Sequence, residues 1–446
     1  MNLKVNNENL DLIESCLISR KIEEYEIFYT NRKAYESIFL KDKVETERDI
    51  NELEYILRIL TQKQDQTGIG IVKGNSLIPK DIERNIDFCI LYSKNNLSSK
   101  YSFPSKSSIP QLSLADPQIV KDPLGVKNDL VEELLTEIQQ QKDVVPTFGR
   151  FRIHNNKTFL RNSNSVDLDS QKTYYFIEFS LKAQENEKLA EYWPFIYVKE
   201  REDLNLPTRV EKWAKLAKAS LVAKIPTPEK ETTIIFSPRV LQSALNNVIG
   251  GHASGKAFHE KLSLFKLNDT VASENLTVID DGLLKGGLNS NGWDGEGSPH
   301  QKSEIIHQGI FQKRIYDQKY AMLEDESSTG NGNRTSDGSV VNGISNFEIL
   351  PGDMSLEEMI SNIESGYYLE QFSRLMPNPL SGTFGSEIRS GYFINNGKIE
   401  YPVKLGNVSG NVFKMIKNCV SISKEREFFA NNLFPYIAFG NLTVSS

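Results

Sequence analysis

Residues 378–404 read NPLSGTFGSEIRSGYFINNGKIEYPVK and predict a β-hairpin. Its turn falls at Asn395–Gly397, where Asn and Gly tolerate the positive φ angles that a tight turn requires. The residues before the turn, Gly391–Ile394, include the aromatic and β-branched types that favour strands. We therefore expect antiparallel strands in this part of the chain.

Glycine is concentrated in the same half of the sequence. Only five of the 28 glycines precede residue 226, and beyond it short apolar pieces alternate with Gly- and Asn-rich turns. Residues 232–236 read as a strand, and Pro238 is expected to open a helix. Such frequent turns favour an antiparallel sheet or an open barrel over alternating strand–helix units. The sequence predicts a β-rich domain over residues 226–446.

The first half of the chain has the pattern of two small α+β units. The first unit, residues 1–94, combines apolar helical spacing with short β-forming stretches. The second unit, residues 95–225, begins with a Ser- and Pro-rich lead-in and ends in an amphipathic helix from Pro207 to Ala223. The predicted fold class is therefore α+β, with two small N-terminal units and a β-rich C-terminal domain.

Three local predictions in this half depend on short patterns. Residues 25–30 and 34–40 are expected to form a pair of strands. Apolar residues after Asp49 recur at three- and four-residue steps and predict a helix. Two adjacent asparagines within residues 151–160 indicate a hairpin turn.

Composition and charge exclude several classes of protein. The net charge is −7 and the pI is near 5.6, with no cluster of Lys and Arg, which argues against a nucleic-acid partner. No apolar run approaches the roughly 18–20 residues that cross a bilayer. The first residues do not resemble a secretory signal, so we expect a cytoplasmic protein. Cys16, Cys89 and Cys419 lie far apart and are expected to be small buried hydrophobes rather than disulfide partners or metal ligands.

The helix that should begin at Pro238 carries the most informative polar residue. Its apolar residues continue at helical spacing to His252, and the segment before this histidine reads Asn247-Val248-Ile249-Gly250-Gly251. A single histidine on an apolar face is more often a hydrogen-bonded core residue than a ligand, because zinc sites usually have three protein ligands.

Four segments in the same order resemble the TldD/TldE (PmbA) family of peptidases. They are a Gly-rich segment, a GNG loop, a strand with a PG turn and short helix, and the hairpin described above, at residues 281–297, 328–334, 345–360 and 378–404. The resemblance covers the C-terminal half at the level of motifs. It implies a PmbA/TldD-like fold.

The resemblance also implies what the helix at 247–252 should carry. TldD-type members have HExxxH here, two metal-binding histidines and a glutamate that can act as general base. In this chain Asn247 replaces the first histidine and Val248 the glutamate, and only His252 remains. The family's third ligand, a cysteine near the C-terminus, has no counterpart in residues 425–446. The chain therefore resembles the TldE-type subunit, with no metal and no catalytic residue of its own.

Partners and substrate follow from the same resemblance. A TldD-type partner would supply a divalent metal, expected to be zinc, in a heterodimer around an internal cavity. Alternatively, the chain would form a homodimer. The complex would degrade or trim unfolded or short peptides. Ser328, Thr329, Gly330 and Asn331 are candidates for holding a peptide backbone, and a turn-rich loop without that role explains them equally well.

Two other functions stay open. The first is an autonomous metallopeptidase with a rearranged site made from His252, His259 and Glu260. The second is a peptide-binding or scaffold protein without enzymatic activity. His300 and His307, with Glu304 between them, are expected to be solvated polar residues in a loop that leads into a strand.

Overall fold

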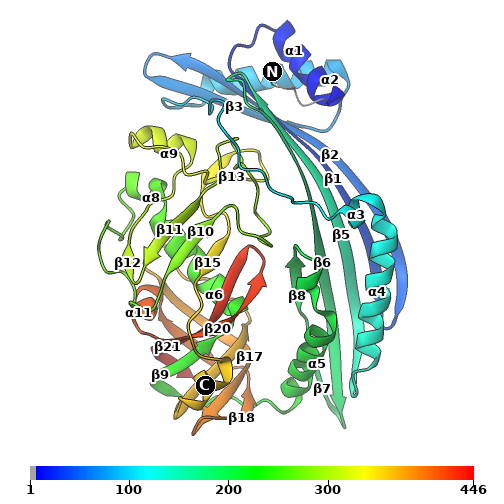
Figure 1. Cartoon of the computed structure of the whole chain (residues 1–446), viewed down its shortest axis with the longest axis vertical. Helices are drawn as coiled ribbons and strands as arrows, with labels where there is room; N and C mark the ends of the chain where they lie inside the picture. Colours follow the sequence, from blue (N-terminus) through cyan, green and yellow to red (C-terminus); the bar gives the residue numbers. More distant parts are fainter. Residues whose placement is uncertain (1–6) are drawn as a thin grey trace.

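The computed structural model describes residues 7–446, which form two layers that face each other (Figure 1). One layer is a sheet of long strands from the first half of the chain, and the other is a β-rich domain from the second half. The predicted α+β class is confirmed. The first six residues, part of the first predicted unit, lie outside the described residues.

The N-terminal sheet is antiparallel throughout and has eight strands. Their order is β4-β3-β2-β1-β5-β6-β7, and β8 also pairs with β6. The strand bounds are β1 (Tyr25–Leu40), β2 (Lys43–Lys63), β3 (Gln66–Gly74), β4 (Leu97–Ser99), β5 (Val144–Asn162), β6 (Asp167–Glu185), β7 (Lys188–Tyr192) and β8 (Phe195–Val198).

Helices cover one face of this sheet. Odd-numbered residues such as Ile27 and Ile153 contribute to cores shared with the helices. Even-numbered residues of the same strands point to the opposite face because side chains alternate along a strand, and Phe28 meets Trp293 of the C-terminal domain there. The helix bounds are α1 (Glu8–Ser19), α2 (Pro79–Asn95), α3 (Pro117–Lys121), α4 (Pro123–Gln139), η1 (Glu202–Leu204) and α5 (Leu206–Val222).

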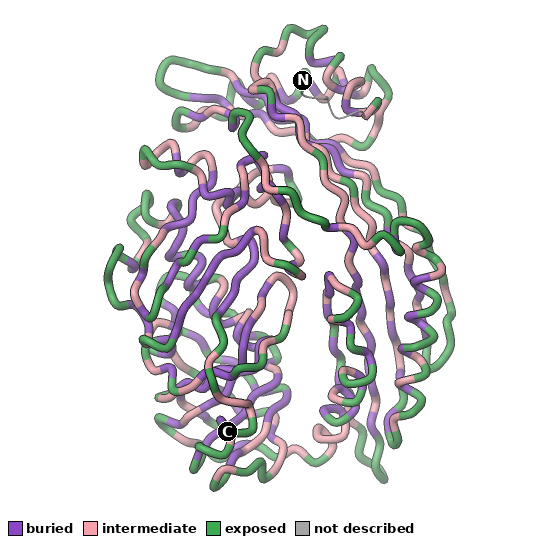
Figure 2. Tube along the Cα trace, viewed as in Figure 1, coloured by how far each residue is buried: buried purple, intermediate pink, exposed green. Residues whose placement is uncertain are grey.

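The C-terminal domain contains a closed barrel. Its sheet runs β12-β11-β10-β15-β21-β19-β17-β16-β9, and β21 also pairs with β9, which closes a ring. An antiparallel sheet or open barrel was expected, but β9–β16 and β15–β21 are parallel and no open edge remains in the ring. Figure 2 shows buried residues throughout this domain.

The predicted hairpin is confirmed as β17 and β18, with Asn396 and Gly397 at positive φ in the turn. The remaining strand bounds are β9 (Glu229–Phe236), β10 (Val278–Asp281), β11 (Lys302–His307), β12 (Ile310–Phe311), β13 (Gly332–Arg334), β14 (Val340–Asn342), β15 (Phe347–Ile349), β16 (Ser365–Phe372), β17 (Thr383–Asn395), β18 (Lys398–Val403), β19 (Asn407–Asn411), β20 (Cys419–Phe429) and β21 (Asn432–Ser445). The short helices outside the metal-motif region are α8 (Gly255–His259), α9 (Gln318–Leu323), α10 (Leu356–Ser361) and α11 (Val412–Lys417).

The three local predictions for the first half are wrong. Residues 25–40 form one strand, since they contain no Gly or Pro that would make a turn. The asparagines within residues 151–160 lie inside continuous β5. The helix expected after Asp49 is part of β2, whose residues 55–60 are buried on both faces and so lack the two-residue alternation of a half-exposed strand.

The proposed boundaries at residues 94 and 225 stay predictions. Strands from both sides of residue 94 are hydrogen-bonded in the same sheet. All three cysteines are buried and free, as expected. None of the helices within residues 7–446 combines the length and the apolar character needed to cross a bilayer.

Candidate functional site

The helix that carries the metal-motif positions changes form along its length. α6 (Pro238–Leu245) leads into a π-helical turn, η2 (Asn246–Gly250), and then into α7 (Gly251–Ala253). Pro238 occupies the first turn, where its missing N–H costs no hydrogen bond. Asn247 is exposed, whereas Val248 is fully buried in the barrel core. π-helical turns occur frequently at functional sites.

His252 is a fully hydrogen-bonded core residue. The N–H of Leu264 donates to Nδ1 at 3.0 Å, so Nε2 carries the ring proton and donates to the carbonyl of Pro379 at 3.0 Å. The rings of Phe265 and Phe413 lie 5.6 and 5.0 Å from the imidazole. Burial lowers the pKa of His252, which favours the neutral ring. Both nitrogens are therefore already used.

The residues at these positions do not fit a divalent metal. Asn247 presents an amide to solvent, Val248 has no donor atom, and His252 has no free nitrogen. Cys419 begins β20 and is buried, which raises the pKa of its thiol to about 12 and disfavours the thiolate that binds metals. This segment supplies neither a ligand set nor a general base.

The rearranged site is not assembled in the structure either. Nδ1 of His259 lies 2.5 Å from the carboxylate of Glu324, and Glu260 accepts a hydrogen bond from the hydroxyl of Tyr320 at 3.0 Å. His252 has other partners. Within residues 7–446 no three His, Cys, Asp or Glu side chains are grouped as metal ligands.

The loop of residues 328–331 is tied down by internal hydrogen bonds. The backbone N–H of Thr329 donates to the carbonyl of Tyr316 at 3.0 Å, and its hydroxyl accepts from the N–H of Tyr316 at 2.7 Å. Gly330 has φ +73°, and a Cβ there would lie 2.2 Å from the carbonyl oxygen of Pro299. Ser328 is only partly buried and lines a small cavity. A peptide-binding role for the loop stays a prediction.

Asn331 is the anchor of this loop. Its side chain is buried, and Nδ2 donates to Asp280 Oδ2 at 2.6 Å and to the carbonyl of Gly343 at 3.0 Å. Oδ1 accepts from the hydroxyl of Thr329 at 2.6 Å. Asp280 also accepts from the N–H of Ser345 at 2.6 Å. This network joins β10 to the segments on either side of the β13–β14 hairpin.

A cavity of about 600 Å³ lies between the sheet and the C-terminal domain, and no motif in the sequence marks it. Even-numbered residues of β1, β5 and β6 form one wall, and the loop around residues 288–300 together with strand β13 forms the other. Lys172 and His300 both line it. Volumes of roughly 300–1,000 Å³ are typical of small-ligand sites.

His300 corrects an expectation, because it is buried rather than solvated. Its Nδ1 lies 3.1 Å from the carbonyl of Gly282, and burial lowers its pKa to about 4, so the ring is neutral at pH 7. His307 is exposed and lies 2.8 Å from Glu304, as expected for a solvated pair, but both residues lie in strand β11 and not in a loop.

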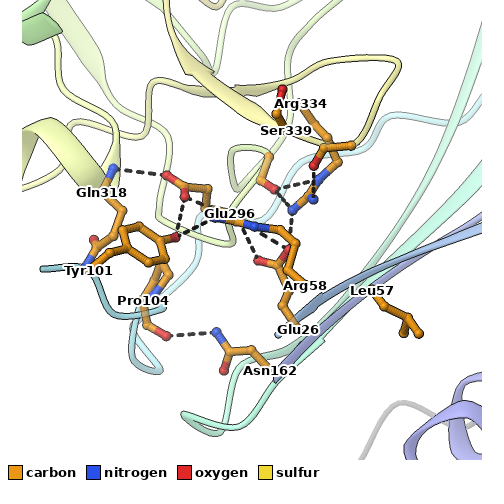
Figure 3. Close-up of polar contacts among 12 residues, drawn as sticks. Glu26, Leu57, Arg58, Tyr101, Pro104, Asn162, Glu296, Gln318, Arg334 and Ser339 are labelled. Carbon is orange, nitrogen blue, oxygen red and sulfur yellow. Dashed lines mark hydrogen bonds and ion pairs between the residues drawn. The ribbon is translucent and has the colours of Figure 1, made fainter. Parts of the chain in front are cut away.

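The two layers are held together by a buried ionic cluster, the interlayer joint, made of Glu26, Arg58, Tyr101, Glu296 and Arg334 (Figure 3). Arg58 Nη1 lies 3.4 Å from both carboxylates, and the Tyr101 hydroxyl donates to Glu296 at 2.6 Å. Arg334 donates to Glu26 at 2.5 Å. The side chains of Arg58, Glu26 and Glu296 are 5%, 0% and 2% exposed. A single patch of charge thus spans sheet and barrel domain.

Because several carboxyl groups are buried, we expect the stability of the protein to decrease as the pH rises through neutrality. Burial raises the pKa of Asp280 and Asp317 to about 7 and that of Asp294 to about 8, all from 3.8. Their stabilising contribution is complete below pH 3.8 and is lost as pH rises through 7 to 8, because the unfolded chain then holds fewer protons. We expect the thermal midpoint to fall between pH 6.5 and 8.

The pKa shifts of other groups affect the stability outside the range of pH 6.5 to 8. Burial lowers the pKa of His154 and His300 to about 4 from 6.5, so their effect lies below pH 6.5 and has the opposite sign. Lys172, with its pKa lowered to about 8, acts mainly above pH 8. A midpoint measured by circular dichroism that stays constant or rises from pH 6.5 to 8 would contradict the prediction.

The C-terminal domain has relatives among known protein families. Residues 229–446 match the model of the PmbA/TldA metallopeptidase C-terminal domain. This match and the relatives named PmbA and TldD metalloproteases confirm the resemblance seen in the C-terminal motifs.

Relatives match over different lengths. The uncharacterized protein MJ0231 of Methanocaldococcus jannaschii is 28% identical over 80% of this chain and 86% of its own length. A metalloprotease TldD homolog of Buchnera aphidicola is 31% identical, but the match spans 49% of this chain and only 46% of that protein. The crystal structure of TldE from Thermococcus kodakarensis superposes with a TM-score of 0.85 at 20% identity, covering 98% and 99% of the two chains. Relatives named metalloproteases indicate a metal in the family.

Proposed function

We propose that the chain is a TldE-type subunit, without a metal of its own, of a cytoplasmic TldD/TldE metallopeptidase that degrades or trims unfolded or short peptides. The observation that carries the proposal is His252, whose two ring nitrogens are both hydrogen-bonded, beside the apolar Val248. A helix of this composition can neither polarise a water molecule nor accept its proton. The metal and the base would come from a TldD-type partner.

The test uses the purified chain alone and together with a TldD-type protein from the same cell. We expect the two to co-purify as a heterodimer, peptide cleavage only in the mixture, and loss of cleavage when the partner's HExxxH glutamate is replaced by Gln. Cleavage by the chain alone, or cleavage by the partner that does not change when the chain is added, would overturn the proposal.

Metal analysis separates this proposal from an autonomous metallopeptidase. We expect much less than one zinc per purified chain, and no change on His252→Ala beyond a loss of stability. Stoichiometric zinc that disappears in His252→Ala but not in His307→Ala, an exposed histidine, would favour the autonomous enzyme instead.

A further inference from the structure

The cavity between the layers has one wall built by strand alternation. Phe28, Asn156, Lys172 and Tyr174 are all even-numbered residues on the sheet face that looks toward the C-terminal domain. Trp293 and three asparagines line the opposite side, and two of these, Asn289 and Asn333, each already donate one amide hydrogen bond to a backbone carbonyl. The lining includes four aromatic residues and four asparagines: Phe28, Tyr174, Tyr197 and Trp293, and Asn156, Asn289, Asn291 and Asn333.

Lys172 is the charge without a counter-ion in this cavity. Its Nζ donates to the carbonyl of Leu288 at 3.2 Å, and none of the ion pairs among residues 7–446 includes it. The neighbouring Lys199 lies 3.8 Å from Glu200 and donates to the carbonyl of Leu114 at 2.6 Å. Burial and Lys199 lower the pKa of Lys172 to about 8, so the ammonium is still charged at pH 7.

The other ionic groups on the cavity wall are already occupied. Asp294 accepts from the backbone N–H groups of Glu296, Ser298 and Gly332 at 2.9, 3.0 and 2.8 Å. Arg334 donates to Glu26 and to the carbonyl of Gly295. Asp294, whose pKa is raised to about 8, is largely neutral at pH 7, and Arg334 is itself a cation, so neither supplies a negative charge to Lys172. Lys172 is half-buried, and an ammonium that is partly removed from water without a counter-ion costs free energy, which an anion bound beside it would offset.

The other residues that line the cavity indicate which kind of anion it would bind. Aromatic faces suit an apolar or aromatic side chain, and carboxamides can both donate to and accept from a peptide group. A volume of about 600 Å³ has room for one or two amino-acid residues. An inorganic anion could use the ammonium and the amide N–H groups, but it would leave the aromatic rings without contacts.

We propose that this cavity binds the C-terminal residue of a short peptide, with Lys172 as the counter-ion of its α-carboxylate. The choice of a peptide over other small carboxylates rests on the proposed function. The carboxylate takes the free donors of Lys172, the terminal side chain lies among the rings, and the last peptide group meets the asparagine amides. This role requires no metal and no partner subunit.

The experiment measures peptide binding to the full chain alone by isothermal titration calorimetry. The probes are a tripeptide ending in phenylalanine with a free carboxylate and the same peptide with a C-terminal amide. We expect the free acid to bind about tenfold or more tightly, as charge-assisted hydrogen bonds imply. Lys172→Gln should abolish this preference, and Lys172→Arg should largely keep it, which shows that the site still folds.

Lys157→Gln is the matched control. Lys157 is exposed and lies on β5 between two residues that line the cavity, so its side chain points to the other face of the sheet. It should keep the preference for the acid. A preference that persists in Lys172→Gln, equal binding of acid and amide by the unaltered chain, or displacement of the peptide by equimolar inorganic phosphate would each overturn the proposal. A failure of the partner experiment would not affect these results.

Discussion

Replacing Arg58 with methionine is expected to lower the free energy of unfolding by about 3–5 kcal/mol, because it leaves a buried carboxylate unpaired. Glu26 would keep Arg334 as a partner, but Glu296 would keep only neutral donors, the Tyr101 hydroxyl and the N–H of Gln318. Methionine fills most of the space of the arginine stem. The loss of stability is therefore caused by the missing charge and not by an empty cavity. Denaturation by urea, followed by fluorescence and circular dichroism, measures it.

Two further variants test whether charge is the cause. Arg58→Met combined with Glu296→Gln should recover much of the lost stability, since no carboxylate is then left without a cation. Arg20→Met removes a 39% exposed arginine that pairs with Asp87 at 2.7 Å, and should cost less than about 1 kcal/mol. A loss for Arg58→Met no larger than that for Arg20→Met would contradict a stabilising role for the interlayer joint.

Features of the fold that depend on local chemistry were predictable from the sequence. The β17–β18 hairpin was located because Asn and Gly specify its turn, and α5 because its apolar residues repeat at helical spacing. The strand β2 was missed because both of its faces are buried near residues 55–60. Such a stretch has no two-residue period, and its spacing of isoleucine and leucine imitates a helix.

The candidate site was predictable only where a motif marked it. His252 was expected to be a hydrogen-bonded core residue, and it is. The interlayer joint and the cavity could not be foreseen, because their residues come from segments hundreds of positions apart, such as Arg58 and Glu296. His300 was expected in solvent since its neighbours in the sequence are polar, yet it is buried against Gly282, which lies 18 positions earlier. Contacts between residues that lie far apart in the sequence leave no local sequence pattern from which they could be predicted.

Asn331→Ala is expected to lower the free energy of unfolding by about 3 kcal/mol. The side chain gives Asp280 one of its donors, also donates to the Gly343 carbonyl, and accepts from Thr329, all in a buried environment. Hydrogen bonds to charged groups contribute about 1.5–3 kcal/mol, and the abandoned acceptors add their own desolvation cost. Thermal and chemical unfolding measure the loss.

Ser328→Ala is the control that separates a structural loop from a peptide-binding one. Ser328 is only partly buried, and its hydroxyl donates to the Tyr316 carbonyl at 3.3 Å, so its removal should change stability by less than about 1 kcal/mol. If the loop holds a peptide backbone, Ser328→Ala should weaken peptide binding while the chain stays fully folded. If the loop only braces β10, Asn331→Ala alone has an effect, and that effect is on unfolding. Equal stability losses in the two variants would show that Asn331 is not the anchor of this loop.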